Sequence, residues 1–239
     1  MKTDAKNIRG ISGSTLKIIA VISMLIDHIG ASLLIQELKY HYTAHLYQIY
    51  AVMRHLIGRL AFPIYCFLLV EGFARTKNRM RYAGRLFLFA LISEIPFDLA
   101  FSGALVDSSH QNVFFTLLIG LLMMWGMAEI EKRNILRGFK MVGYLAVILL
   151  AAAVAKIFSV DYGARGIAAI ALLYLFRKKK VEQIIAGCIA FLWEVTAPLA
   201  FLFVAFYNGK RGLKMKYMFY IFYPLHLLIL YFISVIIFK

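Results

Sequence analysis

Long apolar runs fill most of this chain, and they constrain its fold more than any other feature of the sequence. Hydrophobic residues make up 62% of the 239 positions and charged residues only 16%, and the mean hydropathy is +0.78. A soluble domain is about half apolar and about a quarter charged. A soluble core of this size cannot cover so much apolar surface, so we expect a lipid bilayer to surround most of the molecule.

The apolar runs have the spacing of membrane-spanning helices. We predict an all-α, polytopic transmembrane helical bundle with about nine spans. It forms one domain over residues 1–239, because the chain has four prolines and no Ser/Gln/Pro-rich linker. Several runs are shorter than the ~20 residues that cross a bilayer, and the two runs beside Pro198 are the weakest. The expected spans are 16–35, 56–73, 84–101, 113–128, 141–158, 166–176, 182–195, 197–207 and 217–238.

The basic residues predict how these spans are oriented. With a cytoplasmic N-terminus, the inner segments hold 21 of the 27 Lys and Arg residues, an asymmetry that follows the positive-inside rule. We therefore predict a multi-pass membrane protein with its N-terminus in the cytoplasm. Topology also explains the net charge of +15, so we expect no nucleic-acid partner. The inner segments would be 1–17, 74–85, 129–140, 177–180 and 208–216.

Ionisable residues lie inside several of the expected spans. Asp27 and His28 are about ten residues into the first span, roughly 15 Å deep at 1.5 Å per residue. Glu94 and Asp98 share one face of the third span, and His226 is near the middle of the last one. Each such charge costs about 2.5–3.5 kcal/mol on insertion scales. These groups must therefore face a polar cavity or one another.

Several of these residues also have plain structural explanations. Two carboxylates spaced like Glu94 and Asp98 repel, so one of them keeps its proton or takes a cation, for which Arg59 and Arg85 are candidates. For His226, a packing role and a site role are equal alternatives. Other charges are spaced for helix-end ion pairs, namely Glu71 with Arg75 and Glu129 with Arg133. We find no HExxH motif and no Cys/His cluster, so we expect no metal.

Five blocks, in order, combine polar residues with apolar runs. They are L-K-I-I-A-V-I-S-M-L-I-D-H-I-G (16–30), I-G-R-L-A-F-P-I-Y-C-F-L-L-V-E-G-F (57–73), F-A-L-I-S-E-I-P-F-D-L-A-F (89–101), Q-N-V-F-F-T-L (111–117) and D-Y-G-A-R-G (161–166). Together they resemble the TraX family, the F-pilin acetylation proteins. The stretch Y-P-L-H (223–226) resembles the end of that family.

The resemblance implies a transmembrane-acyltransferase-like protein of the bacterial inner membrane that moves an acetyl group from acetyl-CoA to an acceptor at the outer face. In the type case the acceptor is the N-terminal amine of a pilin subunit; a peptide, glycan or small molecule with an amine or hydroxyl is the wider class. The implied catalytic residues are Asp27, His28, Arg59, Glu94 and Asp98. The candidate substrate-binding residues are Glu71, Gln111, Asn112, Asp161, Tyr162 and His226.

A mechanism joins the resemblance to the charged residues. Acetyl-CoA would bind its phosphates to the inner basic residues Arg75, Lys77, Arg79, Arg81 and Arg85. His28 would act as general base, oriented by Asp27, Glu94 or Asp98. Arg59 or Asn112 would stabilise the oxyanion.

Two other functions remain open at this point. Acidic residues and histidines inside spans also form proton relays, so a proton-coupled transporter or flippase is the main alternative. A non-enzymatic membrane scaffold is the third. It predicts that Asp27, His28, Glu94 and Asp98 can be replaced by apolar residues without loss of function.

Overall fold

The computed structural model describes residues 10–214 and 216–238. Positions 1–9 of the expected inner segment lie outside the described residues. The described part is helical, with two isolated β-bridges, Ile11 to Tyr207 and Gln111 to Val160. The α-helices are α1 (Gly13–Ile29), α2 (Ile35–Tyr40), α3 (Ala44–Ala51), α4 (Ala61–Arg75), α5 (Arg79–Phe101), α6 (Val113–Lys132), α7 (Arg137–Ile157), α8 (Gly163–Leu175), α9 (Lys180–Ala190), α10 (Ala200–Ala205) and α11 (Lys216–Phe238).

Short segments of other pitch join some of these helices. A π-helical turn, Gly30–Leu34, makes α1 and α2 one continuous helix. A second π turn, Val52–Ile57, and a 3-10 turn, Gly58–Leu60, do the same for α3 and α4. A further 3-10 turn, Ala197–Leu199, precedes α10.

The described residues thus form nine continuous helices, one at each expected span. Five of them are long and apolar enough to cross a membrane: Gly13–Tyr40, Ala44–Arg75, Val113–Lys132, Arg137–Ile157 and Tyr217–Phe238. This confirms the prediction that the chain is all-helical and contains helices able to cross a membrane.

One predicted loop is wrong. Residues 36–55 were expected outside the spans, yet the chain is helical there except at positions 41–43. The turn is short because Thr43 caps the next helix, its side chain accepting a hydrogen bond from the Leu46 N–H at 3.1 Å. Helix therefore extends the second span by 12 residues, from Ala44 to His55, at its N-terminal end. As a consequence, Arg54 faces the first helix.

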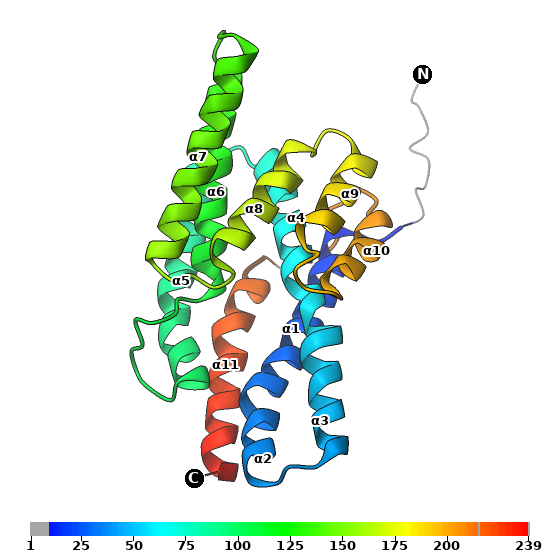
Figure 1. Cartoon of the computed structure of the whole chain (residues 1–239), viewed down its shortest axis with the longest axis vertical. Helices are drawn as coiled ribbons and strands as arrows, with labels where there is room; N and C mark the ends of the chain where they lie inside the picture. The colour runs from blue at the N-terminus through cyan, green and yellow to red at the C-terminus, as the bar shows by residue number, and fades with distance from the viewer. Residues whose placement is uncertain (1–9, 215, 239) are drawn as a thin grey trace.

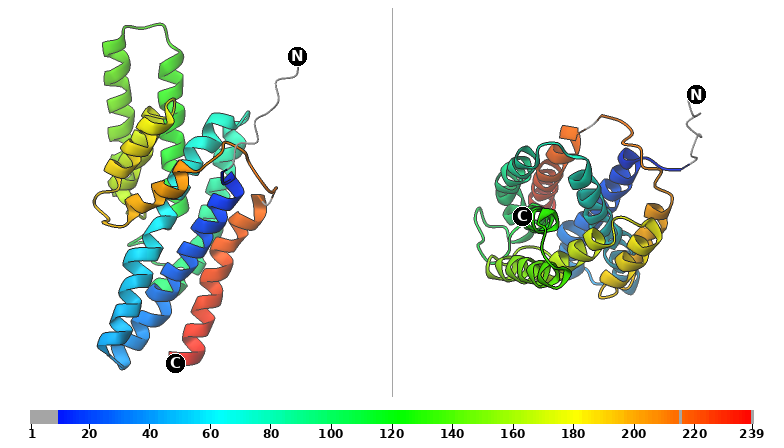
Figure 2. Two further views of the ribbon diagram at one scale, coloured as in Figure 1. Left: turned by 90° about the vertical axis from the view of Figure 1, so that its right-hand side faces the viewer. Right: turned by 90° about the horizontal axis from the view of Figure 1, so that it is seen from above.

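The helices form two groups along the long axis. Figure 1 shows α2, α3 and the end of α11 at one end, and the α6–α7 hairpin reaching the other end. The left view of Figure 2 shows α1 and α11 running alongside each other, and the two helices are in contact. Helix α5 packs on α11 and α6, and α1 packs on α4. The middle of the molecule is therefore enclosed by α1, α4, α5, α6 and α11.

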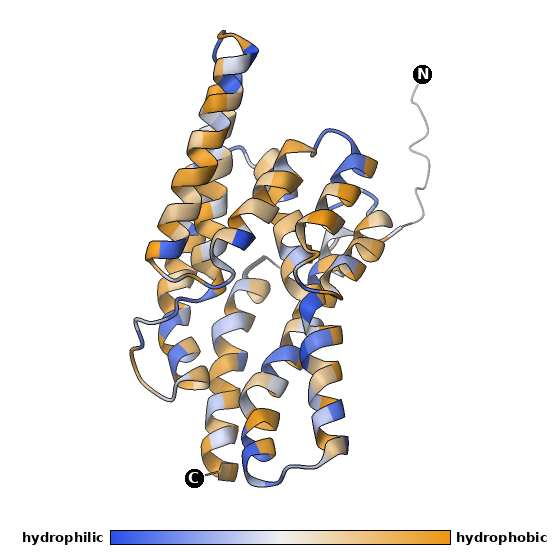
Figure 3. Ribbon diagram, in the orientation of Figure 1, coloured by the Kyte–Doolittle hydropathy of each residue, from blue (hydrophilic) through white to orange (hydrophobic). Residues whose placement is uncertain are grey.

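The outward surface is apolar over most helices (Figure 3). On α7, the large side chains of Leu145, Leu149 and Leu150 are more than half exposed, while its buried side chains are the small Ala151 and Ala155. An exposed apolar surface of this extent suits a lipid environment.

Candidate functional site

A cavity of about 560 Å³ gathers charged side chains from several helices. We call it the acidic cavity, because five carboxylates and two arginines line it. Its charged and titratable residues are Asp27, His28, Arg54, Arg59, Asp98, Asp107, His110, Asp161 and Glu194. Aromatic rings complete the wall: Tyr50, Phe97, Phe101, Tyr162 and Trp193. Asp27, His28, Arg59 and Asp98 of the predicted catalytic residues therefore lie around one space, and Glu94 does not.

Both arginines of the acidic cavity are paired. Arg54 donates to Asp27 Oδ2 at 2.6 Å. Arg59 Nε lies 3.3 Å from Glu194 Oε2, which makes an ion pair although the N–H does not point at the oxygen. The prediction that Arg59 neutralises Glu94 or Asp98 is therefore wrong, because Arg59 forms its ion pair with Glu194.

The Asp27–Arg54 pair depends on a close approach of two helices. A Cβ on Gly58 would overlap the Asp27 side chain, so only glycine fits there. The Ser23 hydroxyl donates to the carbonyls of Ile57, at 2.6 Å, and Gly58, at 3.2 Å. Those carbonyls lie where the helix changes from π to 3-10 pitch, and the Gly58 carbonyl also accepts from the Ala61 N–H.

Glu94 and Asp98 are held by hydrogen bonds from amides. The Asn112 side-chain amide donates to Glu94 Oε2, and also to the Ala90 carbonyl at 2.8 Å. The Asp107 backbone N–H donates to Asp98 Oδ2 at 2.8 Å. Asn112 is fully buried and caps α6. Its amide is thus committed, which corrects its predicted role as a substrate or oxyanion ligand.

The segment between α7 and α8 closes one side of the acidic cavity. Tyr162 has a left-handed backbone (φ 63°), a conformation that costs a non-glycine residue roughly 1–3 kcal/mol and occurs most often at functional sites. Its ring stacks on Phe62 at 3.6 Å. Burial raises the pKa of the neighbouring Asp161 carboxyl to about 6, against the opposing effect of His110, whose Nε2 is 4.0 Å away. Gln111 pairs with Val160 beside this segment and does not line the cavity.

His28 is paired with a residue from the far end of the chain. Its Nδ1 lies 2.7 Å from Nε2 of His226 on α11. His226 is buried, and its Nδ1 lies 2.7 Å from the Phe222 carbonyl oxygen. Asp27 points to Arg54 instead, and Glu94 and Asp98 have the partners described above. The prediction that a carboxylate orients the His28 ring is therefore wrong: a second histidine occupies that position.

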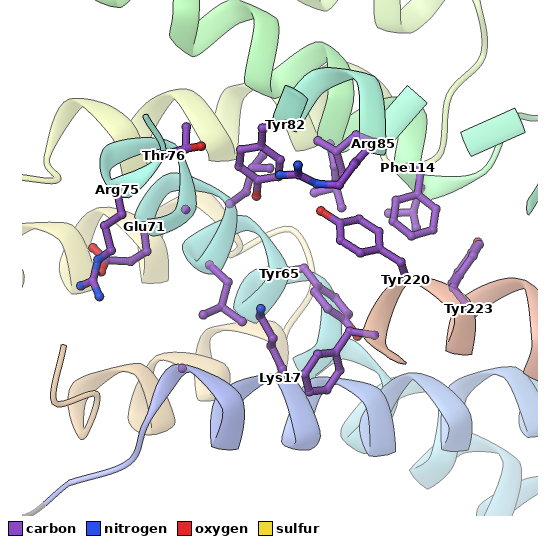
Figure 4. A pocket seen from close by; sticks show the side chains of 18 of the residues that line it. Lys17, Tyr65, Glu71, Arg75, Thr76, Tyr82, Arg85, Phe114, Tyr220 and Tyr223 are labelled. Atoms are coloured by element: carbon purple, nitrogen blue, oxygen red, sulfur yellow. The ribbon is translucent and has the colours of Figure 1, made fainter. Parts of the chain in front are cut away.

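A second cavity, of about 420 Å³, is lined by Met24 of α1, one turn before His28. We call it the basic cavity, because Lys17, Arg75, Arg85 and Arg211 line it with Glu71 as the one acid. Tyrosines form much of its wall: Tyr65, Tyr82, Tyr207, Tyr220 and Tyr223. Figure 4 shows Lys17 rising from α1 and Arg85 extending between Tyr82 and Tyr220.

Only part of the predicted acetyl-CoA set reaches the basic cavity. Arg75 and Arg85 line it, whereas Lys77 and Arg81 are exposed and line neither cavity. Arg79 pairs with Glu129 at 3.0 Å and lies over the Phe73 ring, so its placement argues against a ligand role. Glu129 also bonds Lys132 rather than the expected Arg133.

The predicted ion pair between Glu71 and Arg75 is confirmed at 2.5 Å. It lies in the basic cavity, so Glu71 is separated from the predicted substrate-binding residues Asp161 and Tyr162, which line the acidic cavity. Lys17 and Arg211 were missed as site residues. They had been assigned only to inner loops, and no motif separated them from the other basic residues there.

The two cavities share no lining residue, but they come close to each other along α1. Met24 of α1 lines the basic cavity and His28, one turn later, lines the acidic one. The Tyr223 ring lines the basic cavity, with its centre 6.0 Å from that of His28. Among the described residues, no group of three His, Cys, Asp or Glu side chains could hold a metal ion. The arrangement places an imidazole in the wall of the acidic compartment, one helical turn from the basic one.

The fold and these cavities define an all-helical membrane protein with a polar site inside its bundle. Residues 12–234 match the family model described as TraX protein, and the chain belongs to the TraX family. It is also similar to a protein of Dichelobacter nodosus named "Probable fimbrial assembly protein FimC, serogroup H1". The two are 27% identical over 250 positions, which cover 92% of this chain and 94% of that protein. No solved structure matches the chain.

Proposed function

We propose that the protein is an acetyltransferase that takes an acetyl group from acetyl-CoA in the basic cavity and gives it to an amine in the acidic cavity. One observation carries this proposal. Helix α1 lines two compartments of opposite charge, the basic one with Met24 and, one turn later, the acidic one with His28, which pairs with His226. A charge difference of this kind sorts an anionic donor from a cationic acceptor.

The basic cavity suits the donor. Its volume of about 420 Å³ lies within the range of small-molecule sites, roughly 300–1,000 Å³. Arg85 keeps one buried donor atom, Nε, without a partner among the described residues. Arginine and lysine are the usual ligands of phosphate groups. We propose that these side chains hold the phosphates from the cytoplasmic side and that the pantetheine arm extends toward Tyr223.

The acidic cavity suits a protonated amine. Its two arginines are neutralised by Asp27 and Glu194. Asp98, Asp107 and Asp161 are left without an arginine or lysine partner among the described residues. Hydrogen bonds from Ser109 hold the pKa of Asp107 below its usual range, so that group is ionised at neutral pH. The Tyr162 and Trp193 rings add surfaces that attract cations.

The transfer needs one base close to both cavities. The bound ammonium first loses one proton to the solvent. Its nitrogen then attacks the thioester carbonyl carbon, a new C–N bond forms, and His28 takes the second proton from nitrogen. As the C–S bond breaks, the sulfur leaves with its electron pair and receives that proton from His28. The products are the acetylated amine and CoA thiol.

Acetyl transfer to defined acceptors tests this function. We would incubate the detergent-solubilised protein with radiolabelled acetyl-CoA and a peptide that has a free N-terminal amine. The matched control peptide is identical but already N-acetylated. We expect label in the first peptide only, and calorimetric binding of acetyl-CoA. Absence of binding at millimolar acetyl-CoA, together with solute uptake into liposomes, would instead establish a transporter.

Replacing Arg85 by methionine should weaken acetyl-CoA binding by roughly 10–100-fold, because a charge-assisted hydrogen bond contributes about 1.5–3 kcal/mol. Calorimetry with the purified variant measures this change. Arg81→Met is the matched control: Arg81 is on the same helix, one turn away, but is exposed and lines neither cavity. Equal affinities in the two variants would contradict the assignment of the basic cavity.

Acceptor binding should depend on pH through Asp161. Burial raises its pKa in the fold to about 6 from the ordinary value of 3.8. The protonated form is thus favoured by folding, and this contribution to stability is lost as pH rises through about 6. Above that pH the carboxylate attracts an ammonium. The acceptor KM should therefore fall as pH rises from about 5 to about 7, roughly one pH unit on either side of that pKa.

The Asp161→Asn variant removes the titrating group. Its acceptor KM should be higher than that of the wild type at pH 7, and it should not change between about pH 5 and 7. Steady-state kinetics with the peptide acceptor at a series of pH values measures both. A variant that keeps the wild-type pH dependence of KM would show that another group titrates there.

A further inference from the structure

The two histidine rings are nearly parallel, and their centres are 4.9 Å apart. Their planes differ by 4°, and His28 Nδ1 and His226 Nε2 are 2.7 Å apart. Rings stacked face to face cannot approach that closely, because atoms in van der Waals contact lie about 3.5 Å apart. Parallel planes with a short N–N distance therefore mean a hydrogen bond within the shared plane. One nitrogen donates along the lone pair of the other.

The backbone decides which ring donates. A carbonyl oxygen can only accept, so the 2.7 Å contact with Phe222 O requires a proton on His226 Nδ1. In neutral His226 the other nitrogen, Nε2, is then an acceptor. It follows that His28 carries its proton on Nδ1 and donates it to His226. The second nitrogen of His28, Nε2, has its lone pair free.

We infer that His226 is the positioning residue for His28: it fixes the tautomer that leaves Nε2 of His28, in the wall of the acidic cavity, unprotonated. This inference rests on the proposed acetyl transfer. A chain running from Phe222 O through His226 to His28 performs the same task as the carboxylate that orients the histidine of a catalytic triad. Asp27, the acid next to His28 in sequence, is held by Arg54 instead.

The same contact accounts for the proton during transfer. When His28 Nε2 takes a proton from the acceptor nitrogen, His28 becomes an imidazolium. Its Nδ1–H remains directed at His226 Nε2, which shares the positive charge through the hydrogen bond. When the C–S bond breaks, the Nε2 proton passes to the leaving sulfur and both rings return to their neutral states. His226 therefore ends the reaction with the same proton that it had at the start.

Two substitutions at position 226 separate positioning from packing. His226→Leu removes the acceptor, so kcat should fall about 10²-fold, the lower end of the contribution of general base catalysis. The Kd of acetyl-CoA should not change. His226→Gln places an amide oxygen where Nε2 was, and it should recover kcat to within about tenfold of the wild type by restoring that acceptor. Rescue by glutamine and not by leucine is not expected of a residue that only fills space.

A spectroscopic measurement tests the tautomer directly. Nitrogen NMR of the wild type with labelled histidine, assigned with His28→Gln, should show His28 protonated at Nδ1 and unprotonated at Nε2. A proton found on Nε2 overturns the inference. So does a His226→Leu variant that binds acetyl-CoA and keeps wild-type kcat. If the wild type transfers no acetyl group, the proposed function fails, and the NMR result alone still decides the positioning role.

Discussion

Replacing His28 by glutamine should reduce acetyl transfer about 10³–10⁴-fold, the upper part of the range for general base catalysis. Glutamine keeps a hydrogen-bonding side chain of similar reach but has no nitrogen that takes a proton at neutral pH. The acceptor amine would then have to attack without losing its proton. Single-turnover kinetics with labelled acetyl-CoA and a peptide amine measures the chemical step separately from binding.

The binding of acetyl-CoA provides the control for this variant. His28 lines the acidic cavity and not the basic one, so the Kd of the donor should stay within about twofold, because no contact with the donor is removed. Transfer at the wild-type rate by His28→Gln would exclude His28 as the base. Loss of donor binding together with transfer would point to misfolding instead.

The second large effect concerns stability. Arg54→Met should lower the free energy of unfolding by about 3–5 kcal/mol, the cost of leaving one member of a buried ion pair uncompensated. Both side chains of the pair are more than three-quarters covered, Arg54 at 21% and Asp27 at 13% exposure. In addition, Asp27 Oδ1 already lacks a hydrogen-bond partner among the described residues. Reversible denaturant unfolding in detergent micelles measures the loss.

A second substitution shows whether the unpaired charge is responsible. The double variant Asp27→Asn with Arg54→Met removes both charges, so it should be more stable than Arg54→Met alone. Arg137→Met, at the exposed start of α7, is the surface control and should change stability by less than about 0.5 kcal/mol. If the double variant is no more stable than Arg54→Met, packing and not charge explains the loss.

Charged residues inside apolar runs were the part of the site that the sequence could reveal. Asp27, His28 and Asp98 stand out because lipid rejects charges, and this argument needs no knowledge of neighbouring helices. It predicts that such residues converge, and they do line one cavity. It does not predict which residue pairs with which. The His28–His226 contact joins positions 198 residues apart, and no spacing rule covers that distance.

Arg54 was missed for a different reason. Residues 36–55 contain histidines, tyrosines and glutamines between apolar residues, so hydropathy predicts a loop outside the membrane. The structure makes this stretch helical and turns Arg54 toward Asp27. Packing against α1 outweighs the local composition, as tertiary contacts often do. The start of the second span was set 12 residues too late, at 56 instead of 44, and Arg59 was assigned to Glu94 or Asp98 although its partner is Glu194.

The two π turns limit where residues can be inserted into or deleted from the first two helices. Gly30–Leu34 and Val52–Ile57 lie against each other, and a Cβ on Gly30 would come within 3.0 Å of Arg54. Each residue of a helix turns the chain by roughly 100°, at 3.6 residues per turn. Deleting one residue from either turn would rotate all of that helix beyond it, and side chains now facing lipid would face the protein. Gaps between homologous sequences should therefore be confined to the hairpin at 41–43 and avoid the helices on either side of it.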